Sequence, residues 1–135
     1  MKKNLKMTPE GTKDFLFAEC SAMDYICTSI EKVFVKGGFK RVITPALEFY
    51  DVFSIPSSGI SQESMFKTTD NKGRLLVARP DSTLPIARMV STRLKNNTLP
   101  VRLYYKQAVY RNNPSLAGRR NEFLPVSYTH LTLPT

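Results

Sequence analysis

Residues 74–94 read RLLVARPDSTLPIARMVSTRL and predict a strand, a short connection and a helix. Residues 74–78 are mostly apolar and predict a strand. Thr83 is a suitable N-cap for a helix that runs to Leu94, and Pro85 falls in the first turn, where proline is tolerated. Residues 79–83, Arg-Pro-Asp-Ser-Thr, therefore form a connection from strand to helix, a place where side chains can converge on a ligand.

The segments just upstream predict a hairpin. Residues 65–69 and 74–78 flank Asp-Asn-Lys-Gly at 70–73, which is a four-residue turn signal. Residues 54–64 read as a polar loop, and residues 47–53 are expected to form one or two helical turns.

The N-terminal part predicts a helix followed by a strand. Apolar side chains recur at three- and four-residue spacing and predict a buried helical stripe: Met23, Ile26, Cys27, Ile30, Val33 and Phe34. Gly37-Gly38 ends this helix, because glycine tolerates the left-handed conformation. Residues 39–44 then form a short strand that Pro45 stops. Cys20 and Cys27 lie about 10 Å apart along the helix, too far for a disulfide, so both are expected to be reduced core residues.

Further downstream, residues 101–110 predict one long strand and residues 112–118 a loop. The order of elements is helix, strand, hairpin, helix and long strand. This order predicts an α+β fold with a mostly antiparallel sheet flanked by helices.

The charge of the chain is concentrated in one segment. Residues 1–71 carry nine Lys/Arg and nine Asp/Glu, whereas residues 72–124 carry eleven Lys/Arg against Asp81 and Glu122. The formal net charge of +9 therefore belongs to residues 72–124. Such a localised field predicts an anionic partner: a nucleotide, a carboxylate, a pyrophosphate or a nucleic-acid backbone.

The length of 135 residues predicts one domain. The chain has no apolar run long enough to span a membrane, and no apolar segment follows the N-terminal lysines. We therefore expect no membrane contact, no secretory signal and a cytoplasmic location.

The last eleven residues, PVSYTHLTLPT at 125–135, differ in character from the rest. They carry no charged residue, and they resemble the in-frame translation of a common sequencing adapter. We interpret residues 1–124 as the N-terminal part of a domain and residues 125–135 as a non-native tail; the alternative is a native strand bounded by proline. His130, the single histidine, lies in this tail. Without it the chain has no imidazole for catalysis or for metal ligation. We also expect the tail to replace no missing strand, so that residues 101–110 present an open edge.

Two groups of residues could contact a ligand. Asp81 can accept the α-ammonium group of an amino acid, with Thr83 beside it and an arginine such as Arg79 to grip a carboxylate. The alternative is that Asp81 and Thr83 cap the following helix while Arg79 lies at the surface. Arg111, on the other side of the loop from Arg119 and Arg120, could form a phosphate clamp; the alternative is a solvated charged hairpin. The sequence has no phosphate-binding glycine loop and no visible catalytic machinery.

Taken in order, these motifs resemble the core of class II aminoacyl-tRNA synthetases, in particular the histidyl branch. Residues 44–48, Thr-Pro-Ala-Leu-Glu, resemble the first class II motif, whose proline (here Pro45) lies at the dimer interface. Residues 79–83 resemble an Arg-Pro-Glu-Gly-Thr element that contacts the α-amino group of histidine. Residues 110–111 and 120–123 resemble the second motif, whose first arginine grips the α-phosphate of ATP. The resemblance covers residues 7–124.

Departures from the synthetase pattern point to a subfamily. Asp81 stands where a synthetase has glutamate, and Asn113 replaces the glutamate that orients adenine. Residues 8–14, 47–51 and 79–88 are similar to regulatory subunits of ATP phosphoribosyltransferase, paralogues that have lost aminoacylation. Such a subunit joins a short-form catalytic subunit in a hetero-octamer at the first step of histidine biosynthesis, which histidine inhibits.

This resemblance implies a non-catalytic, allosteric subunit that activates its partner and transmits feedback by histidine. It implies that Asp81, Thr83 and Arg111 contact histidine and that Pro45 takes part in self-association. Arg79, Arg88, Arg119 and Arg120 are further candidates for anion binding. The resemblance implies no cofactor and no metal, and tRNA is not the expected partner. Two rival hypotheses remain: a fragment of a histidyl-tRNA synthetase, which would use tRNA, ATP and Mg²⁺, and a non-catalytic nucleic-acid or nucleotide-binding module.

Overall fold

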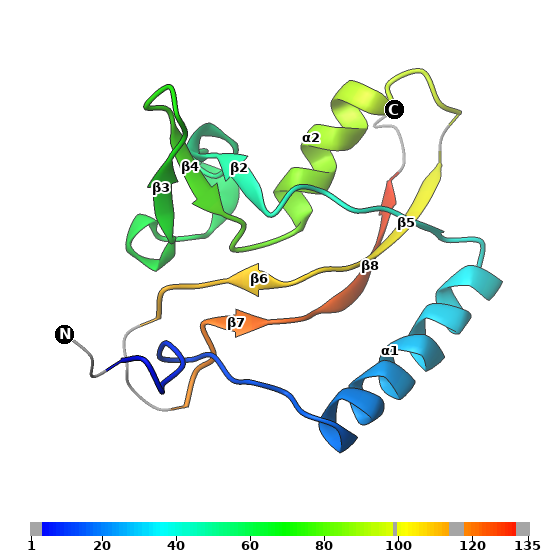
Figure 1. Cartoon of the computed structure of the whole chain (residues 1–135). Coiled ribbons are helices and arrows are strands. Elements are labelled where there is room, and N and C mark those ends of the chain that lie inside the picture. The colour runs from blue at the N-terminus through cyan, green and yellow to red at the C-terminus, as the bar shows by residue number, and fades with distance from the viewer. Residues whose placement is uncertain (1–3, 99, 114–117, 132–135) are drawn as a thin grey trace.

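The computed structural model describes residues 4–98, 100–113 and 118–131. Within them the chain forms an α+β arrangement of two helices and three small, mostly antiparallel sheets, as predicted (Figure 1). The elements are α1 (Ala18–Lys36), β1 (Lys40–Arg41), β2 (Leu47–Phe49), β3 (Lys67–Thr69), β4 (Leu75–Ala78), α2 (Thr83–Arg93), β5 (Val101–Lys106), β6 (Val109–Tyr110), β7 (Glu122–Phe123) and β8 (Val126–Leu131). Short 3-10 turns occupy Tyr50–Val52, Pro56–Ser58 and Gln62–Ser64.

The end of α1 follows the prediction from Gly37-Gly38. Gly38 adopts φ +83°, the left-handed region in which glycine carries no steric cost. The Gly38 N–H donates to the Val35 carbonyl and the Phe39 N–H to the Phe34 carbonyl, both at 3.0 Å. This is the Schellman pattern, and the Phe34 and Phe39 rings complete it with centroids 5.8 Å apart.

The predicted apolar stripe of α1 is only partly buried. Cys27 is buried, but Ile26 and Val33 are 57% and 68% exposed. Cys20, also expected in the core, is exposed, and it and Cys27 are free thiols. The prediction was wrong at these positions because α1 packs on the narrow β5–β8 surface through the side that carries Cys27 and Phe34.

The hairpin prediction is confirmed by antiparallel pairing of β3 with β4. The Asp70 carboxylate closes the turn by accepting the Lys72 and Arg74 N–H groups, each at 2.9 Å. The helical prediction for residues 47–53 was wrong for its first part. Residues 47–49 are strand β2, because they pair antiparallel with residues 76–78 of β4, and only residues 50–52 form a 3-10 turn.

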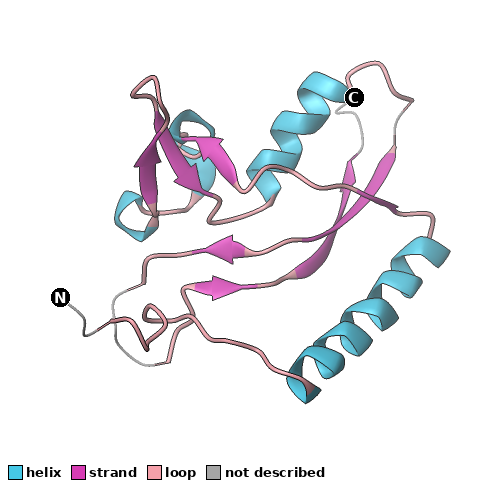
Figure 2. Cartoon of the chain, in the orientation of Figure 1, coloured by secondary structure: helices cyan, strands magenta, loops and turns pink. Residues whose placement is uncertain are grey.

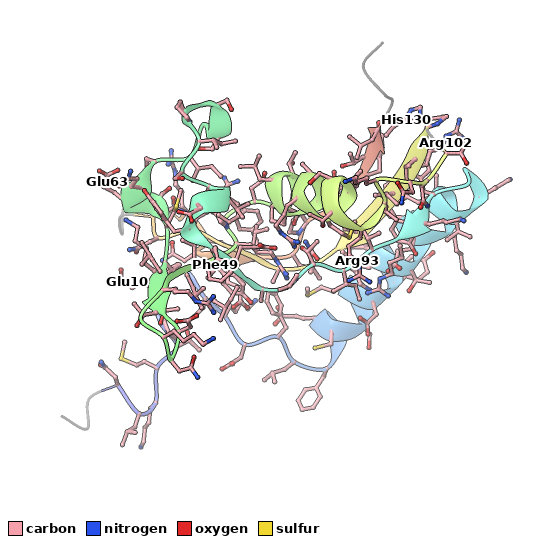
Figure 3. All side chains as sticks on the ribbon, turned by 90° about the horizontal axis from the view of Figure 1, so that it is seen from above. Glu10, Phe49, Glu63, Arg93, Arg102 and His130 are labelled. Carbon is pink, nitrogen blue, oxygen red and sulfur yellow. The ribbon has the colours of Figure 1, made fainter. Side chains whose placement is uncertain are left out.

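The predicted long strand is split into β5 and β6 at Gln107 and Ala108. β5 pairs in parallel with β1 on one edge and antiparallel with β8 on the other, from Val101↔Leu131 to Lys106↔Val126. The expectation of an open edge was therefore wrong, because residues 126–131 form the neighbouring strand. Figure 3 shows Arg102 and His130 side by side in this pairing. The origin of residues 125–135 remains a prediction.

The two helices pack against opposite faces of β5 (Figure 2). Side chains alternate between the two faces of a strand. Leu103 and Tyr105 form a buried cluster with Ile86 of α2, whereas Tyr104 contacts α1 through the Phe34 ring. A second cluster, Phe53, Met65 and Val77, lies under β4. These packings hold the connection between β4 and α2 over the junction of β5 and β6.

Candidate ligand-binding site

The connection between β4 and α2, residues 79–82, is called the connector below. Its first residue, Arg79, is buried. The Arg79 Nε donates to the Ala108 carbonyl at 2.6 Å, and Nη1 donates to the Thr44 carbonyl at 2.9 Å. Burial lowers the pKa of the Arg79 guanidinium, and the Glu48 carboxylate acts in the opposite direction. The alternative that placed Arg79 at the surface was wrong, because Arg79 is buried and its bonds hold the chain. Its candidacy for anion binding stays a prediction.

Asp81 and Thr83 lie at the start of α2. The Asp81 Oδ2 accepts the Thr83 N–H at 3.1 Å, and Oδ1 accepts the Thr83 hydroxyl at 3.4 Å. Helix α2 begins at Thr83, so the residue at the N-cap position is Ser82, one residue before the prediction. Asp81 thus satisfies one of the free N–H groups of the helix, as the capping alternative proposed.

Asp81, Thr83 and Arg111 line one cavity of about 250 Å³. The Arg111 Nε donates to the Pro80 carbonyl at 3.0 Å, and the guanidinium carbon lies 5.4 Å from the centre of the Phe123 ring. The other lining residues are Pro80, Ser82, Tyr105, Val109, Phe123, Pro125 and Ser127. A carboxylate and a guanidinium in one cavity match the two charges of a free α-amino acid. The structure thus brings together the three residues singled out in the sequence.

Arg88 lies outside this cavity. Its Nε and Nη2 donate to the two carboxylate oxygens of Glu48 at 2.9 and 2.7 Å. Glu48 is buried in β2, so this bidentate pair ties α2 to β2 and occupies the guanidinium fork. Arg88 therefore has a bond within the fold, and its candidacy for anion binding stays a prediction.

Arg119 and Arg120 line a second cavity of about 370 Å³. Lys13, Phe15 and Glu10 of the N-terminal segment lie on its other side, and the Arg120 guanidinium carbon is 5.6 Å from the centre of the Phe15 ring. The predicted phosphate clamp is therefore split, because Arg111 belongs to the first cavity. The loop predicted for residues 112–118 lies partly outside the described residues.

Asn121 fastens the N-terminal segment to the second cavity, a role that sequence analysis missed. Its N–H donates to the Gly11 carbonyl at 2.8 Å, its Nδ2 donates to the Glu10 carbonyl at 3.0 Å, and its Oδ1 accepts the Asn113 N–H at 3.1 Å. Gly11 has φ +73°, and a Cβ there would lie 2.5 Å from the Asn121 nitrogen. A glycine in the turn-rich segment 8–14 was the available signal.

Gln107 is a second functional candidate that the sequence did not reveal. Its carboxamide is buried and contacts Thr44 and Ser82 at the base of the connector. In sequence it stands inside a β-rich run, where nothing marks a polar network.

Pro45 lies exposed between Thr44 and Ala46. Ile43, Leu47 and Phe49, at alternate positions around it, are 69%, 48% and 42% exposed. The segment therefore presents an apolar row to solvent, and its role as a dimer interface stays a prediction.

The described residues hold neither a metal-binding cluster nor a membrane-spanning helix. Among residues 4–98, 100–113 and 118–131, no cluster of three or more His, Cys, Asp or Glu side chains could hold a metal ion. In the same described part of the chain, neither helix has the length and apolarity needed to cross a membrane.

Comparison with known proteins places this geometry in context. The family model described as histidyl-tRNA synthetase matches residues 11–128. The ATP phosphoribosyltransferase regulatory subunit of Clostridium acetobutylicum is 44% identical over 117 residues, which are 87% of this chain and 29% of that protein. The regulatory subunit of Clostridium kluyveri is 45% identical over 117 residues, with 87% and 30% covered. A solved structure from Bacillus halodurans, described as an ATP phosphoribosyltransferase regulatory subunit/histidyl-tRNA synthetase, superposes with a TM-score of 0.80 at 33% identity.

The Bacillus halodurans superposition covers 92% of this chain and 32% of that one. These findings confirm the class II synthetase-like α+β fold and the resemblance to regulatory subunits. The chain spans about three tenths of the length of the curated relatives it matches.

Proposed function

The chain belongs to the histidyl-tRNA synthetase family, and from that premise we propose that it acts as a regulatory subunit of ATP phosphoribosyltransferase and binds free histidine. The observation that carries the proposal is that Asp81, Thr83 and Arg111 line the same cavity. Asp81 would take the α-ammonium group and Arg111 the α-carboxylate. The names of relatives at 44–45% identity support the choice of subfamily.

The proposed action is allosteric and non-catalytic. Histidine can change the activity of a partner only if it binds one assembly state more tightly than another. The proposed partner is a short-form catalytic subunit in a hetero-octamer, in the cytoplasm, with the exposed row around Pro45 serving self-association. Asn113 supports the absence of aminoacylation, because its Nδ2 donates to the Arg120 carbonyl at 3.2 Å where a synthetase would present a carboxylate to adenine.

Calorimetric titration with histidine tests the proposal directly. It should be run on the 135-residue chain and on a chimaera in which residues 1–124 continue into the Clostridium acetobutylicum relative. Asp81→Asn keeps an oxygen that can cap α2 but removes the charge. Asp81 is half-buried without ligand, and truncating one partner of a charge pair that is buried in a complex costs about 2–5 kcal/mol. Histidine affinity should therefore fall by more than about tenfold.

The matched control is Asp24→Asn, the same change at an exposed position of α1. Histidine affinity should not change in this variant. An Asp81→Asn protein that binds histidine as tightly as the parent would refute the assignment of Asp81.

The description of the family model and the basic segment 72–124 favour one alternative, histidyl-tRNA synthetase activity. The chimaera should fail to exchange pyrophosphate into ATP in the presence of histidine, and it should stimulate a short-form phosphoribosyltransferase in a way that histidine reverses. Robust exchange would instead establish the synthetase.

A further inference from the structure

We propose that Gln107 is a positioning residue: its buried carboxamide fixes the connector and thereby places Asp81 and Thr83 at the cavity. The consequence for ligand affinity rests on the proposed binding of histidine, whereas the consequence for the connector does not. Gln107 itself is absent from the cavity lining, so any effect it has on binding must pass through other residues.

The Gln107 carboxamide bonds on both sides to distant parts of the chain. Its Nε2 donates to the Thr44 Oγ1 and to the Ser82 Oγ, each at 2.9 Å, and its Oε1 accepts the Thr44 N–H at 3.1 Å. Gln107, Thr44 and Ser82 are 5%, 4% and 1% exposed. The network therefore uses both donors of one side chain in a setting shielded from water, where a hydrogen bond is strong and an unpaired polar group is costly.

Ser82 is the part of the connector that this network holds. It stands between Asp81 of the connector and Thr83, the first residue of α2, and all three line the cavity. Fixing the Ser82 hydroxyl fixes the peptide units on either side. The Ser82 carbonyl also accepts the Ile86 N–H at 3.1 Å, the first helical hydrogen bond of α2. Gln107 is thus coupled to the orientation of the helix start.

The rest of the connector is already anchored by other groups. The Arg79 N–H donates to the Ala46 carbonyl at 2.9 Å, the Arg79 carbonyl accepts the Tyr110 N–H at 3.0 Å, and Arg111 bonds to the Pro80 carbonyl. Ser82 is the last residue of the connector, and the hydrogen bond from Gln107 anchors it. A site held in its binding geometry before the ligand arrives loses less entropy on binding, so this link should appear in affinity.

The position of Gln107 explains why a strand is broken there. β5 ends at Lys106 and β6 begins at Val109. The intervening Ala108 carbonyl accepts the Arg79 Nε at 2.6 Å, so both residues of the break bond to the connector or its neighbour. The interruption between β5 and β6 therefore supplies the hydrogen-bonding groups that hold the connector.

The first test needs no ligand and uses the 135-residue chain. Gln107→Met preserves side-chain length and removes the donors and the acceptor. Amide hydrogen exchange measured by NMR should then show at least about fivefold faster exchange at Ile86, whose acceptor is the Ser82 carbonyl, reflecting the loss of about one net hydrogen bond. The Leu94 amide, which donates to Val90 at the far end of α2, is the internal reference and should not change.

Two variants serve as comparisons. Gln62→Met makes the same substitution at an exposed position in a 3-10 turn and should leave the Ile86 amide unchanged. Ser82→Ala deletes the other end of the same hydrogen bond with a smaller change in shape. It should reproduce the effect at Ile86, and it keeps the test available if Gln107→Met does not fold.

The second test measures histidine affinity in a double-mutant cycle. Gln107→Met and Ser82→Ala should each weaken binding by about five- to tenfold. The double variant should bind histidine about as tightly as the more weakly binding of the two single variants. Both substitutions remove the same hydrogen bond, so their effects should not add. A merely structural role would leave the affinity of the folded fraction unchanged.

The two tests separate the two ideas. If the parent chain and the chimaera fail to bind histidine while Ile86 responds as expected, the proposed function is wrong and the positioning role is supported. If Ile86 exchange is the same in the parent and in both variants, or if the two affinity losses add, the positioning role of Gln107 is overturned.

Discussion

At the scale of single residues, the cavity depends on side chains that bond to backbone carbonyls of distant segments. Arg79 reaches the Thr44 carbonyl, 35 residues away, and the Ala108 carbonyl, 29 residues away. Arg111 reaches the Pro80 carbonyl, 31 residues away. The rigid fork of arginine suits such bridging, because several donors are presented in fixed directions. The same residue type therefore holds the fold at position 79 and lines the cavity at position 111.

Arg79→Met should destabilise the chain strongly. The variant leaves two carbonyls without donors, and hydrogen bonds to charged groups are worth about 1.5–3 kcal/mol each. We expect the free energy of unfolding to fall by about 2–4 kcal/mol, measured by urea denaturation. Arg119→Met, at an exposed arginine, should change it by less than about 0.5 kcal/mol. Equal stability of the two variants would show that the buried fork contributes nothing.

At the scale of elements, α1 is tied to β5 by a polar pair as well as by aromatic rings. The Lys106 Nζ lies 2.8 Å from the Glu31 Oε1, and the Tyr104 hydroxyl donates to the Glu31 Oε2 at 3.4 Å. The hydrogen bond from Lys106 holds the pKa of Glu31 below its ordinary value, although partial burial acts against it. The same bond raises the pKa of Lys106. Both shifts mean that the charged pair stabilises the docked helix.

The stability that the Glu31–Lys106 pair contributes depends on pH. A lowered carboxyl pKa gives stability that is present above the unfolded pKa of Glu31 and lost as pH falls through the folded value. A raised lysine pKa gives stability that is present below the unfolded pKa of Lys106 and lost as pH rises through the folded value. Glu31→Gln should therefore lower the free energy of unfolding at neutral pH by at most about 1 kcal/mol, which appears as a lower melting temperature. The difference in melting temperature from the parent should vanish in acid.

Glu19→Gln is the matched control for this prediction. Glu19 pairs with Lys13 at 2.6 Å, but both side chains are about half exposed, so its loss should have little effect at any pH. Thermal melts of the three proteins between acid and neutral pH provide the measurement. A Glu31→Gln deficit that persists unchanged in acid would contradict the assignment to charge.

The elements also show which parts of the fold the sequence could predict. The β3–β4 hairpin and the end of α1 were predicted correctly, because Asp70 and Gly38 act on residues within a few positions of themselves. Residues 47–49 were misassigned because β4 decides their conformation from about 30 residues away. The break at Gln107 was missed for the same reason, since its partners are Thr44 and Ser82.

The candidate site was also predictable from the sequence only in part, and again the distance along the chain explains the difference. Asp81 and Thr83 are neighbours in sequence, and Arg111 follows a strand that passes beside them, so their convergence in one cavity could be expected. The hydrogen-bond partners of Arg79 and Arg88 could not be foreseen, because Thr44 and Glu48 lie 35 and 40 residues earlier in the sequence. A basic residue in a motif gives no sign of whether a carbonyl or a carboxylate already occupies it.

At the scale of the whole molecule, much apolar surface remains exposed. Tyr25, Ile26 and Val33 on α1 are more than half exposed, and so is Ile43 beside Pro45. Large apolar side chains exposed to this degree are candidates for contacts with other protein surfaces. The curated relatives are about three times longer than the matched region. The row around Pro45 is the part of this surface that the proposed function assigns to self-association.

Strand β8 lies within residues 125–135. β8 covers one edge of β5 along its whole length. Its Tyr128 ring packs on Phe34 and Phe39, with centroids 5.5 and 5.3 Å away. A chain ending at residue 124 would therefore expose an unpaired edge and an aromatic cluster, and an exposed edge is a template for association. We expect this variant to form larger species than the 135-residue chain in size-exclusion chromatography with light scattering, and to melt less cooperatively.

Tyr128→Thr in the 135-residue chain separates the two causes, because threonine keeps the strand and removes the ring. If it stays as small as the parent while the shortened chain associates, the open edge is responsible; if it associates as well, the aromatic cluster is. A shortened chain with the same oligomeric state and the same cooperative melt as the parent would show that β8 adds nothing to folding. That result would contradict the interpretation of residues 125–135 as a truncation scar, because a core cut short at residue 124 lacks neighbouring strands and should not melt cooperatively by itself.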